Sequence, residues 1–430
     1  MNDEGTKVSS ITHIHAREVL DSRARPTVEV EIHCGERFGR ALVPSGASTG
    51  QAEALELRDG DPSRHEGLGV LRAVSHVNDT IAPALVGMDP VDQAAIDQQL
   101  LELDDTPQKT KLGGNALLGV SLAAAHVAAS VAGIRLFEHL NRLYRTASGE
   151  HELPPRMPLP MTNMISGGLH AGGNLDFQDV LIVPVGASSY SLGLEWLVRV
   201  YRHLGRRLGE AGYEGRLVGD EGGYGPRLQT NEQAVEMVVG AIQAAGLMPE
   251  RDITIALDVA ATHFHDNGYY QLATERNTRL TSVEMIDRLE KWVERYPITS
   301  IEDPLAEEDW SGWQLLTQRL GGSVQLVGDD LFTTNADRVQ KGVELAAANS
   351  VLVKVNQIGT LTETFRTIDT ARRAGYSIVV SARSGETEDA TIAPLAVAVA
   401  AEQIKIGSIV RSERLAKYNE LLRIEEAVVG

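Results

Sequence analysis

Charged residues stand at the ends of five short apolar runs in the second half of the chain. Asp258, Glu302 and Asp329 end the runs ITIALD, ITSIE and VQLVGD, and Lys354 and Lys405 end SVLVK and QIK. Three carboxylates of this kind are the oxygen ligands that Mg²⁺ prefers. A part-buried lysine beside other cations can have a lowered pKa and act as a general base. Together these residues predict metal-assisted proton abstraction. The alternative for the three acids is that they cap helices or turns, and the alternative for Lys354 is a structural ion pair.

Other residues in this half of the chain could contact an anion or move a proton. Arg383 and Ser384 follow the run SIVVSA, the turn DEGG contains Glu221, and four glycines surround His170 in SGGLHAGGN. Solvated turns and loops are the alternative interpretation of Glu221 and His170. The segment 45–50 (SGASTG) lacks the Gly-Lys-Ser/Thr of a nucleotide-binding P-loop, which excludes that motif but leaves a small phosphate as a ligand.

The apolar runs themselves predict the elements that position these residues. The gaps between the five charged ends are 44, 27, 25 and about 50 residues, which leaves room for one or two helices between buried parallel strands. In a (β/α)₈ barrel the carboxyl ends of the strands open into one shared pocket. The fold class predicted is therefore α/β, with a TIM-type barrel that gathers the three acids, the two lysines and Arg383.

The first third of the chain has a different pattern. Residues 8–45 alternate in short strand-like bursts, and residues 68–103 and 112–142 have helical patterns, which indicates an α+β unit. A proline-rich and polar stretch at 146–160 is typical of a linker. We therefore predict an α+β N-terminal capping domain at 1–145 and the barrel at 146–430. Within the barrel, 231–245 and 360–374 are predicted as outer helices that stop at Gly246 and Gly375.

Composition restricts the partners. The formal net charge of −19 disfavours binding to nucleic acid or to an anionic membrane. The stretch 112–134 carries no Asp, Glu, Lys or Arg and is long enough to span a bilayer, but its Ala, Gly and polar residues favour a buried helix. The opening residues have no apolar signal segment, and the one cysteine, Cys34, fits a reducing compartment. We expect a cytoplasmic protein.

Long motifs along the chain resemble those of enolase, the phosphopyruvate hydratase of glycolysis. They are VPSGASTG, EALELRDGD, VGDEGGYGP, SIEDP, LVGDDLF, KVNQIGTLTET and RSGETEDATIA. The resemblance covers nearly the whole chain. It implies a hydro-lyase with an enolase-type barrel behind an N-terminal cap, two Mg²⁺ ions per site, and a homodimer or higher homo-oligomer. It also implies a small anionic phosphorylated substrate, namely 2-phosphoglycerate, which is dehydrated to phosphoenolpyruvate.

The resemblance implies a role for each residue that matches a motif. Lys354 matches the base that removes the C2 proton, and Glu221 matches the acid that assists departure of the C3 hydroxyl. The ligands implied for the first Mg²⁺ are Asp258, Glu302 and Asp329, and the ligand implied for the second is Ser48 on a lid loop. The substrate contacts implied are His170 on a second lid loop, Gln178, Asp179, Arg383 and Ser384 near the phosphate, and Lys405 at the carboxylate.

Several positions of the site depart from the family's pattern. A histidine of the family is replaced by Ala382, a glutamate by Asp179, an asparagine by Ser166, and the residue after Lys405 is Ile406. Loss of an imidazole removes a donor and makes room. Three functions therefore stay open: ordinary 2-phosphoglycerate dehydration, dehydration of a bulkier phospho- or phosphonoglycerate analogue by a specialised paralogue of a phosphonate or antibiotic pathway, and a non-catalytic scaffold or binding role.

Overall fold

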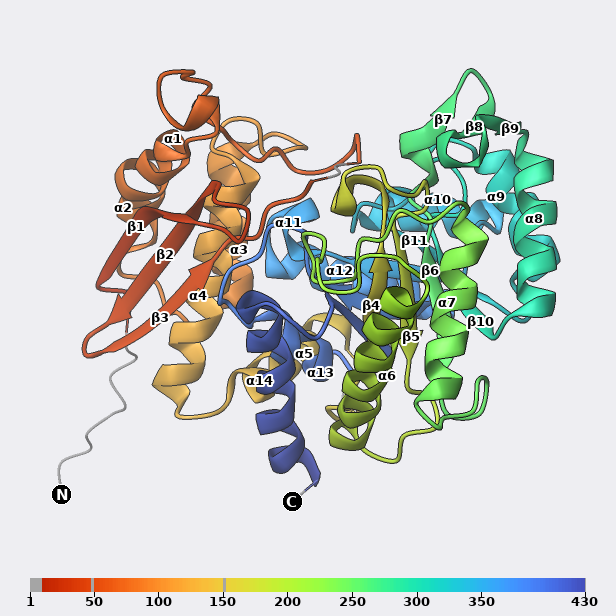
Figure 1. Cartoon of the computed structure of the whole chain (residues 1–430). Coiled ribbons are helices and arrows are strands. Elements are labelled where there is room, and N and C mark those ends of the chain that lie inside the picture. The colour runs from red at the N-terminus through yellow and green to blue at the C-terminus, as the bar shows by residue number, and fades with distance from the viewer. Residues whose placement is uncertain (1–9, 48–49, 150–151, 430) are drawn as a thin grey trace.

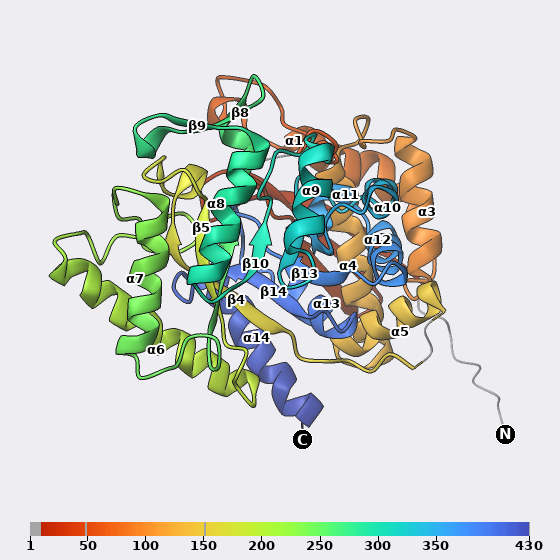
Figure 2. The ribbon, with the colours of Figure 1, turned by 90° about the vertical axis from the view of Figure 1, so that its right-hand side faces the viewer.

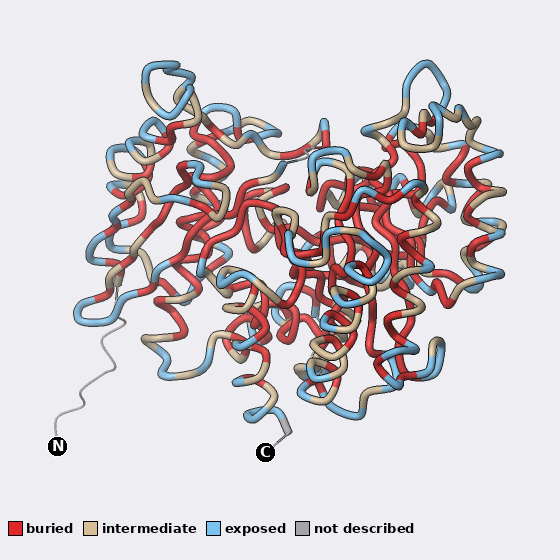
Figure 3. Tube along the Cα trace, viewed as in Figure 1, coloured by how far each residue is buried: buried red, intermediate tan, exposed pale blue. Residues whose placement is uncertain are grey.

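The chain folds into a cap and a barrel that share a core. The computed structural model describes residues 10–47, 50–149 and 152–429. The cap, red and orange in Figure 1, lies beside a closed barrel drawn in yellow, green and blue. Buried residues run through both parts (Figure 3), and one continuous apolar cluster contains residues of both. The two parts are therefore packed against each other rather than joined by the linker alone.

The cap is the α+β unit that the sequence predicts. Its strands form an antiparallel meander of β1 (His13–Leu20), β2 (Pro26–Cys34) and β3 (Arg37–Leu42). Its helices are α1 (Leu71–Ser75), α2 (Ala82–Leu85), α3 (Gln93–Asp104), α4 (Gly114–Ala132) and α5 (Leu136–Ser148). On one face of the sheet, α4 packs against β2 and β3; α1 and α2 pack against β1.

Small residues allow α4 to approach the sheet closely. A β-carbon on Gly39 would lie 2.2 Å from the backbone nitrogen of Val127, and one on Gly119 would lie 2.7 Å from the side chain of Val30. Among the described residues, α4 is the one helix long and apolar enough to cross a bilayer, and 78% of that stretch is buried inside the protein. The charge-free stretch is thus a core helix, as predicted.

Eight strands close the barrel. In order around it they are β4 (Leu159–Ser166), β5 (Asp179–Val183), β6 (Thr254–Asp258), β10 (Ile298–Glu302), β11 (Gln325–Gly328), β12 (Ser350–Val353), β13 (Ser377–Ser381) and β14 (Gln403–Gly407). The five apolar runs of the sequence are β6, β10, β11, β12 and β14, and all of them are parallel, which confirms their interpretation. Inward side chains such as Leu181, Ala256 and Leu352 fill the interior.

One strand runs against the others. β5 is antiparallel to both β4 and β6. Its first residue, Asp179, therefore pairs with the last residue of β6, Asp258. Because β5 runs in the opposite direction, its first residue lies at the barrel end where the other strands have their last residues. The sequence did not reveal this reversal, because a short apolar run has the same pattern in either direction.

Helices surround the barrel (Figures 1 and 2). They are α6 (Tyr190–Glu210), α7 (Asn231–Ala244), α8 (Ser282–Arg295), α9 (Trp310–Leu320), α10 (Ala336–Leu345), α11 (Val355–Ile358), α12 (Leu361–Arg373), α13 (Ile392–Ala398) and α14 (Ser412–Val429). The helices predicted at 231–245 and 360–374 are α7 and α12. The glycines after them, Gly246 and Gly375, have φ of +73° and +78°, the left-handed conformation of a helix stop.

The remaining elements lie at the rim and at the junction. A small antiparallel sheet of β7 (His265–Asp266), β8 (Tyr269–Leu272) and β9 (Thr278–Leu280) extends beyond the barrel at the top of Figure 1. At the junction, α5 continues to Ser148, so the predicted boundary after residue 145 falls in its last turn.

Candidate active site

The predicted site residues meet at the barrel end where the parallel strands finish. Asp258 and Glu302 are the last residues of β6 and β10 and lie side by side in the sheet. Asp329 and Lys354 directly follow β11 and β12, and Lys405 lies within β14. All five side chains are buried. The barrel thus brings three acids and two lysines to one enclosed end.

Lysine ammonium groups lie against the acids. Nζ of Lys405 donates to Oδ2 of Asp258 at 2.7 Å and to Oε2 of Glu302 at 2.6 Å, so two carboxylates share one cation. Nζ of Lys354 forms a close ion pair with Asp329. Burying charges is unfavourable unless they are paired in this way. The structural ion pair that the sequence left open for Lys354 is therefore present.

These pairs determine the protonation of the cluster. Burial lowers the pKa of Lys354, but the negative charges near it, Asp329 foremost, together outweigh burial and the net direction is upward. Burial and the charge of Asp258 raise the pKa of Glu302 to about 8, against the opposing effect of Lys405. The sequence predicts a lowered pKa for Lys354, and the structure differs because a carboxylate contacts the ammonium group directly.

Carboxylates at this end could hold a divalent cation. Two groups of described residues have ligand atoms within 4.8 Å of one another, namely His170, Asp179 and Glu221, and Asp303, Asp329 and Asp330. The predicted trio of Asp258, Glu302 and Asp329 is not one of these groups. Its donors are nevertheless all oxygen, and the lysines against them show that positive charge is stabilised there. That donor set fits Mg²⁺.

Asp303 supports the metal-ligand candidate Asp329 and was missed by sequence reasoning. Its carboxylate accepts the backbone N–H groups of Asp329 at 2.9 Å and of Asp330 at 2.8 Å, which holds the turn after β11. Nε2 of Gln357 donates to the side chain of Asp329 at 2.9 Å. Asp303, Asp330 and Gln357 lie in the motifs SIEDP, LVGDDLF and KVNQIGTLTET, close to residues that were predicted as site residues. Their position in these motifs is the sequence signal that could have identified them.

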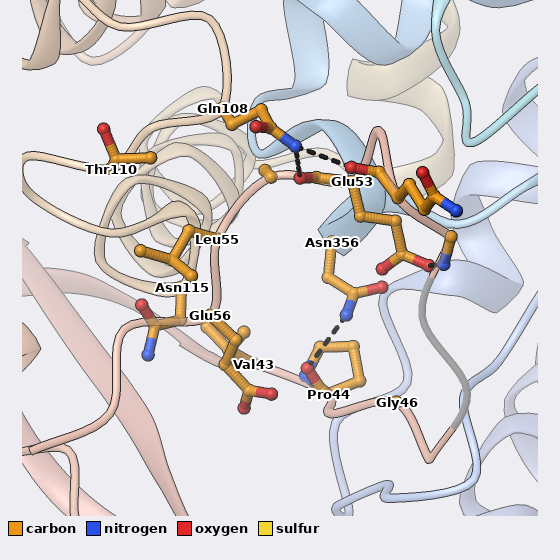
Figure 4. Close-up of a pocket in the computed structure, with 13 residues that line it drawn as sticks. Val43, Pro44, Gly46, Glu53, Leu55, Glu56, Gln108, Thr110, Asn115 and Asn356 are labelled. Atoms are coloured by element: carbon orange, nitrogen blue, oxygen red, sulfur yellow. Dashed lines mark hydrogen bonds between the residues drawn. The ribbon is translucent and has the colours of Figure 1, made fainter. Parts of the chain in front are cut away.

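Arg383 is braced by a residue of the cap. Its Nη1 donates to Oε2 of Glu53 at 2.9 Å and to Oδ1 of Asn356 at 3.0 Å. Glu53 and Asn356 also line a cavity of about 520 Å³ where the cap meets the barrel (Figure 4), and Asn356 donates there to the carbonyl of Pro44. The guanidinium is thus held by both parts of the protein. Sequence reasoning missed Glu53 because its partner is 330 residues away.

The start of the segment 45–50 is anchored beside Ser384. Arg23 donates to Oγ of Ser384 at 3.0 Å and to the carbonyl of Ser45 at 3.1 Å. Ser45 and Gly385 exchange two backbone hydrogen bonds of 2.8 and 2.9 Å. The beginning of the predicted lid loop is therefore attached to the barrel. Ser48, predicted as a ligand of the second Mg²⁺, lies outside the described residues.

His170 lies between two carboxylates rather than in solvent. Its Nδ1 is 2.8 Å from Oδ2 of Asp179, and its Nε2 is 3.6 Å from Oε1 of Glu221. Oγ of Ser166 donates to the other oxygen of Asp179 at 2.7 Å, and Asn163 donates to Oε2 of Glu221 at 3.0 Å. Ser166 and Asp179, two departures from the family's pattern, are thus partners of each other.

The proton in this group is held by the imidazole. Burial lowers the pKa of His170, but the charges of Glu221 and Asp179 raise it to about 9. Burial raises the pKa of Glu221, but the surrounding cations, His170 foremost, lower it to about 2. Glu221 is therefore an ionised carboxylate here. The sequence predicts that Glu221 is protonated at the moment the C3 hydroxyl leaves, and the imidazolium of His170 lies 3.6 Å away as a source of that proton.

A small cavity of about 20 Å³ connects the groups. Its lining residues are Ala47, His170, Gln178, Glu221, Lys354, Ser381, Ala382, Arg383, Ser384 and Lys405. Nε2 of Gln178 donates to Asp258 at 3.0 Å, so this amide contacts an acid rather than Arg383 or Ser384. Of the other departures, Ala382 lines the cavity, and Ile406 lies in the apolar core. The cavity has room for about one water molecule, and lysine, arginine and serine side chains line it.

Two protein-family profiles match the chain. "Enolase, N-terminal domain" matches residues 11–140, which contain most of the cap. "Enolase, C-terminal TIM barrel domain" matches residues 155–430, which contain the barrel and its charged end. Together the two matches cover most of the chain in the order that the fold shows.

Proposed function

The chain belongs to the enolase family, and we propose that it dehydrates 2-phosphoglycerate to phosphoenolpyruvate. The observation that supports this most directly is the cavity that Lys354 and Glu221 line together with Arg383, Ser384 and Lys405. A base, an acid partner and three anion-binding groups around one small volume are the groups needed to remove water from a phosphorylated hydroxy acid.

In this proposal Lys354 takes the proton from C2. That proton is weakly acidic, because its removal places a second negative charge on the adjacent carboxylate. Nζ of Lys354 must leave Asp329 and give up its own proton before it can accept another. Lys405 would then stabilise the dianion through its ammonium group, which is held at the same end of the barrel.

The second step breaks the bond between C3 and its hydroxyl. Hydroxide is a poor leaving group, so a proton must reach that oxygen as the C2–C3 double bond forms. We assign this proton to the pair of His170 and Glu221. His170 carries it in the free protein, and Glu221, 3.6 Å away, receives it and passes it to the leaving oxygen. Asp179 positions the imidazole from the other side.

Two Mg²⁺ ions belong to this proposal. Asp258, Glu302 and Asp329 would hold the first and Ser48 would contribute to the second. When bound, the ions supply positive charge next to the substrate carboxylate and phosphate. We further propose a homodimer or higher homo-oligomer in the cytoplasm. The net charge of −19 favours neither nucleic acid nor an anionic membrane as a partner.

The direct test is the formation of phosphoenolpyruvate from 2-phosphoglycerate by the purified protein. The absorbance of phosphoenolpyruvate should rise in the presence of Mg²⁺. The rise should stop after chelation with EDTA and resume when Mg²⁺ is restored. Lys354→Ala, measured beside the wild type, should form no product. A wild type that forms none with Mg²⁺ present would reject this substrate.

A second candidate is supported by Ala382. Its methyl group lines the cavity at the position of a family histidine, so the site has one donor fewer and more room. A bulkier phospho- or phosphonoglycerate analogue would use that room. Loss of one polar contact in an enclosed site raises the barrier by on the order of 2–4 kcal/mol, so activity on 2-phosphoglycerate should then be weak.

The two candidates separate in one comparison. The double substitution Ala382→His and Asp179→Glu restores the family's residues. If the substrate is a bulkier analogue, kcat/KM for 2-phosphoglycerate should rise in the double variant and turnover of the analogue should fall. Full activity of the wild type on 2-phosphoglycerate, unaltered by the two substitutions, would leave only the first candidate.

A further inference from the structure

An arginine of the C-terminal helix binds the backbone of residues that line the small cavity. Arg414 lies in the first turn of α14 and is completely buried. Its Nη1 donates to the carbonyl oxygen of Arg383 at 2.6 Å and to that of Ile406 at 3.0 Å. Its Nη2 donates to the carbonyl oxygen of Ser384 at 2.6 Å. One guanidinium group therefore joins the turn after β13 to the neighbouring strand β14.

These carbonyl groups belong to the candidate substrate contacts or adjoin them. Arg383 and Ser384 are the candidate phosphate contacts, and Ile406 follows Lys405. Carbonyl groups in a turn have no partner in the sheet, and a buried carbonyl group without a donor is unfavourable. The planar fork of a guanidinium can serve three carbonyl groups at once, which a lysine ammonium on its flexible stem matches poorly. Arg414 thus fixes the backbone from which the substrate contacts extend.

The side chain of Arg414 also packs beside the segment that carries Glu221. Gly407 has φ of +106°, and a β-carbon on it would lie 3.0 Å from Cδ of Arg414 and 3.0 Å from the carbonyl oxygen of Glu221. The backbone N–H of Ser408 donates to that same oxygen at 2.8 Å. Among the cations that lower the pKa of Glu221, Arg414 comes directly after His170. The glycine after Ile406 therefore leaves the space through which the arginine reaches the site.

The charge of Arg414 is poorly neutralised by the protein. Lys354, Arg383 and Lys405, which line the cavity, are each paired with a buried carboxylate. Within the described part of the chain, Arg414 forms a single long ion pair, in which Oε1 of Glu413 is 3.8 Å from Nε. Neither of these two atoms makes a hydrogen bond. A buried cation whose close partners are neutral carbonyl groups leaves positive potential at this end of the barrel, which favours an anion there.

We propose that Arg414 is a positioning residue for the anionic substrate: its guanidinium holds the backbone of Arg383 and Ser384, and its charge favours binding of the phosphate group. The identity of the substrate rests on the proposed function, but anion binding is tested without it. A phosphate group is bound alike before and during the reaction, so loss of Arg414 should raise KM more than it lowers kcat. Residues that orient the ligands of a metal site contribute about 10- to 100-fold, and we expect an effect of that size on phosphate affinity.

The test uses the full-length protein with Mg²⁺ and two substitutions, Arg414→Gln and Arg414→Lys. Binding of inorganic phosphate is measured by ³¹P NMR titration, and kcat and KM are measured with 2-phosphoglycerate. Arg414→Gln should weaken phosphate binding about 10- to 100-fold and raise KM by a similar factor, with a smaller fall in kcat. Arg414→Lys keeps the charge but serves fewer carbonyl groups, so its phosphate affinity should lie between those of the wild type and Arg414→Gln.

The matched control is Arg372→Gln. Arg372 also binds backbone carbonyl groups, those of Val399 at 2.5 Å and Ala400 at 2.9 Å, but before β14 begins, at the other end of the barrel. This variant should bind phosphate as the wild type does.

Wild-type phosphate affinity and KM in Arg414→Gln would overturn the proposal, even with lowered stability, since the role would then be structural only. If circular dichroism shows that Arg414→Gln is unfolded, Arg414→Lys decides, and wild-type phosphate affinity in that variant would overturn the proposal. A wild type that forms no phosphoenolpyruvate, but whose phosphate binding depends on Arg414, would reject the proposed substrate and support the role of Arg414.

Discussion

Replacing Asp179 by asparagine should release the proton that His170 holds in the site. In the wild type the imidazole lies between Asp179, at 2.8 Å, and Glu221, at 3.6 Å, and is buried with only 6% of the residue exposed. Asp179→Asn keeps the shape of the side chain and removes its charge. Glu221, with a smaller contribution from Asp258, then opposes the effect of burial, which by itself lowers the pKa of His170.

The magnitude follows from the raised pKa. The rise from 6.5 to about 9 corresponds to about 3 kcal/mol in favour of the imidazolium in the folded protein. Asp179 is the nearer of the two acids, so its loss should lower the free energy of unfolding by about 1.5–3 kcal/mol. A raised pKa stabilises the fold fully below the unfolded value of about 6.5, and this contribution disappears as pH rises through about 9.

The assay compares denaturant unfolding of wild type and Asp179→Asn at about pH 6 and about pH 9.5, together with an NMR titration of His170 assigned with His170→Gln. The difference in stability should be large at the lower pH and small at the higher one, and the pKa of His170 should fall below about 8. Ser166→Ala is the matched control: it removes one hydrogen bond to the same carboxylate, about 1 kcal/mol, and should leave the pKa of His170 near 9. An unchanged pKa in Asp179→Asn, or a stability difference equal at both pH values, would refute the reasoning.

Three further predictions follow from the site. Lys354→Ala should abolish exchange of the C2 proton of 2-phosphoglycerate with deuterated solvent, measured by NMR, whereas Glu221→Gln should stop dehydration and keep the exchange. Glu53→Gln removes the ion pair between Glu53 and the buried guanidinium of Arg383, so the free energy of unfolding should fall by about 3–5 kcal/mol in denaturant titrations. Gly385→Ala would place a β-carbon 2.7 Å from the carbonyl of Ser45, so it should lower stability by about 1–3 kcal/mol, measured by thermal unfolding, and raise KM through the displaced lid.

Two variants serve as controls for these predictions. Arg366→Gln breaks an ion pair with Asp337 whose side chains are 72% and 87% exposed, so stability should change by less than about 1 kcal/mol. Gly322→Ala adds a methyl group with nothing within 4 Å and should be neutral. C2 exchange at the wild-type rate in Lys354→Ala would assign the base elsewhere. If Glu53→Gln is as stable as Arg366→Gln, the buried ion pair contributes little to stability. If Gly385→Ala is as stable as Gly322→Ala, the backbone bridge between Ser45 and Gly385 contributes little.

Much of the fold was predictable because buried parallel strands leave a strong local pattern. Each apolar run ends at the same side of the barrel, so the order of residues alone was enough to assign Asp258, Glu302, Asp329, Lys354 and Lys405 to one place. Of the barrel helices, α7 and α12 were predicted from the 3.6-residue period and the glycines that stop them. The reversed strand β5 was not, since its apolar residues would be buried in either direction.

The sequence by itself thus determined which chemical groups gather at the barrel end, because strand order and residue type set them. Only the tertiary structure decided which residues pair: Lys354 with Asp329, Arg383 with Glu53, and His170 with Asp179 through the reversed β5. Those pairs join residues 9 to 330 positions apart, so no local pattern specifies them. Protonation depends on these partners and on burial. The charge carried by Glu221 and His170 was therefore decided by packing and not by the order of residues.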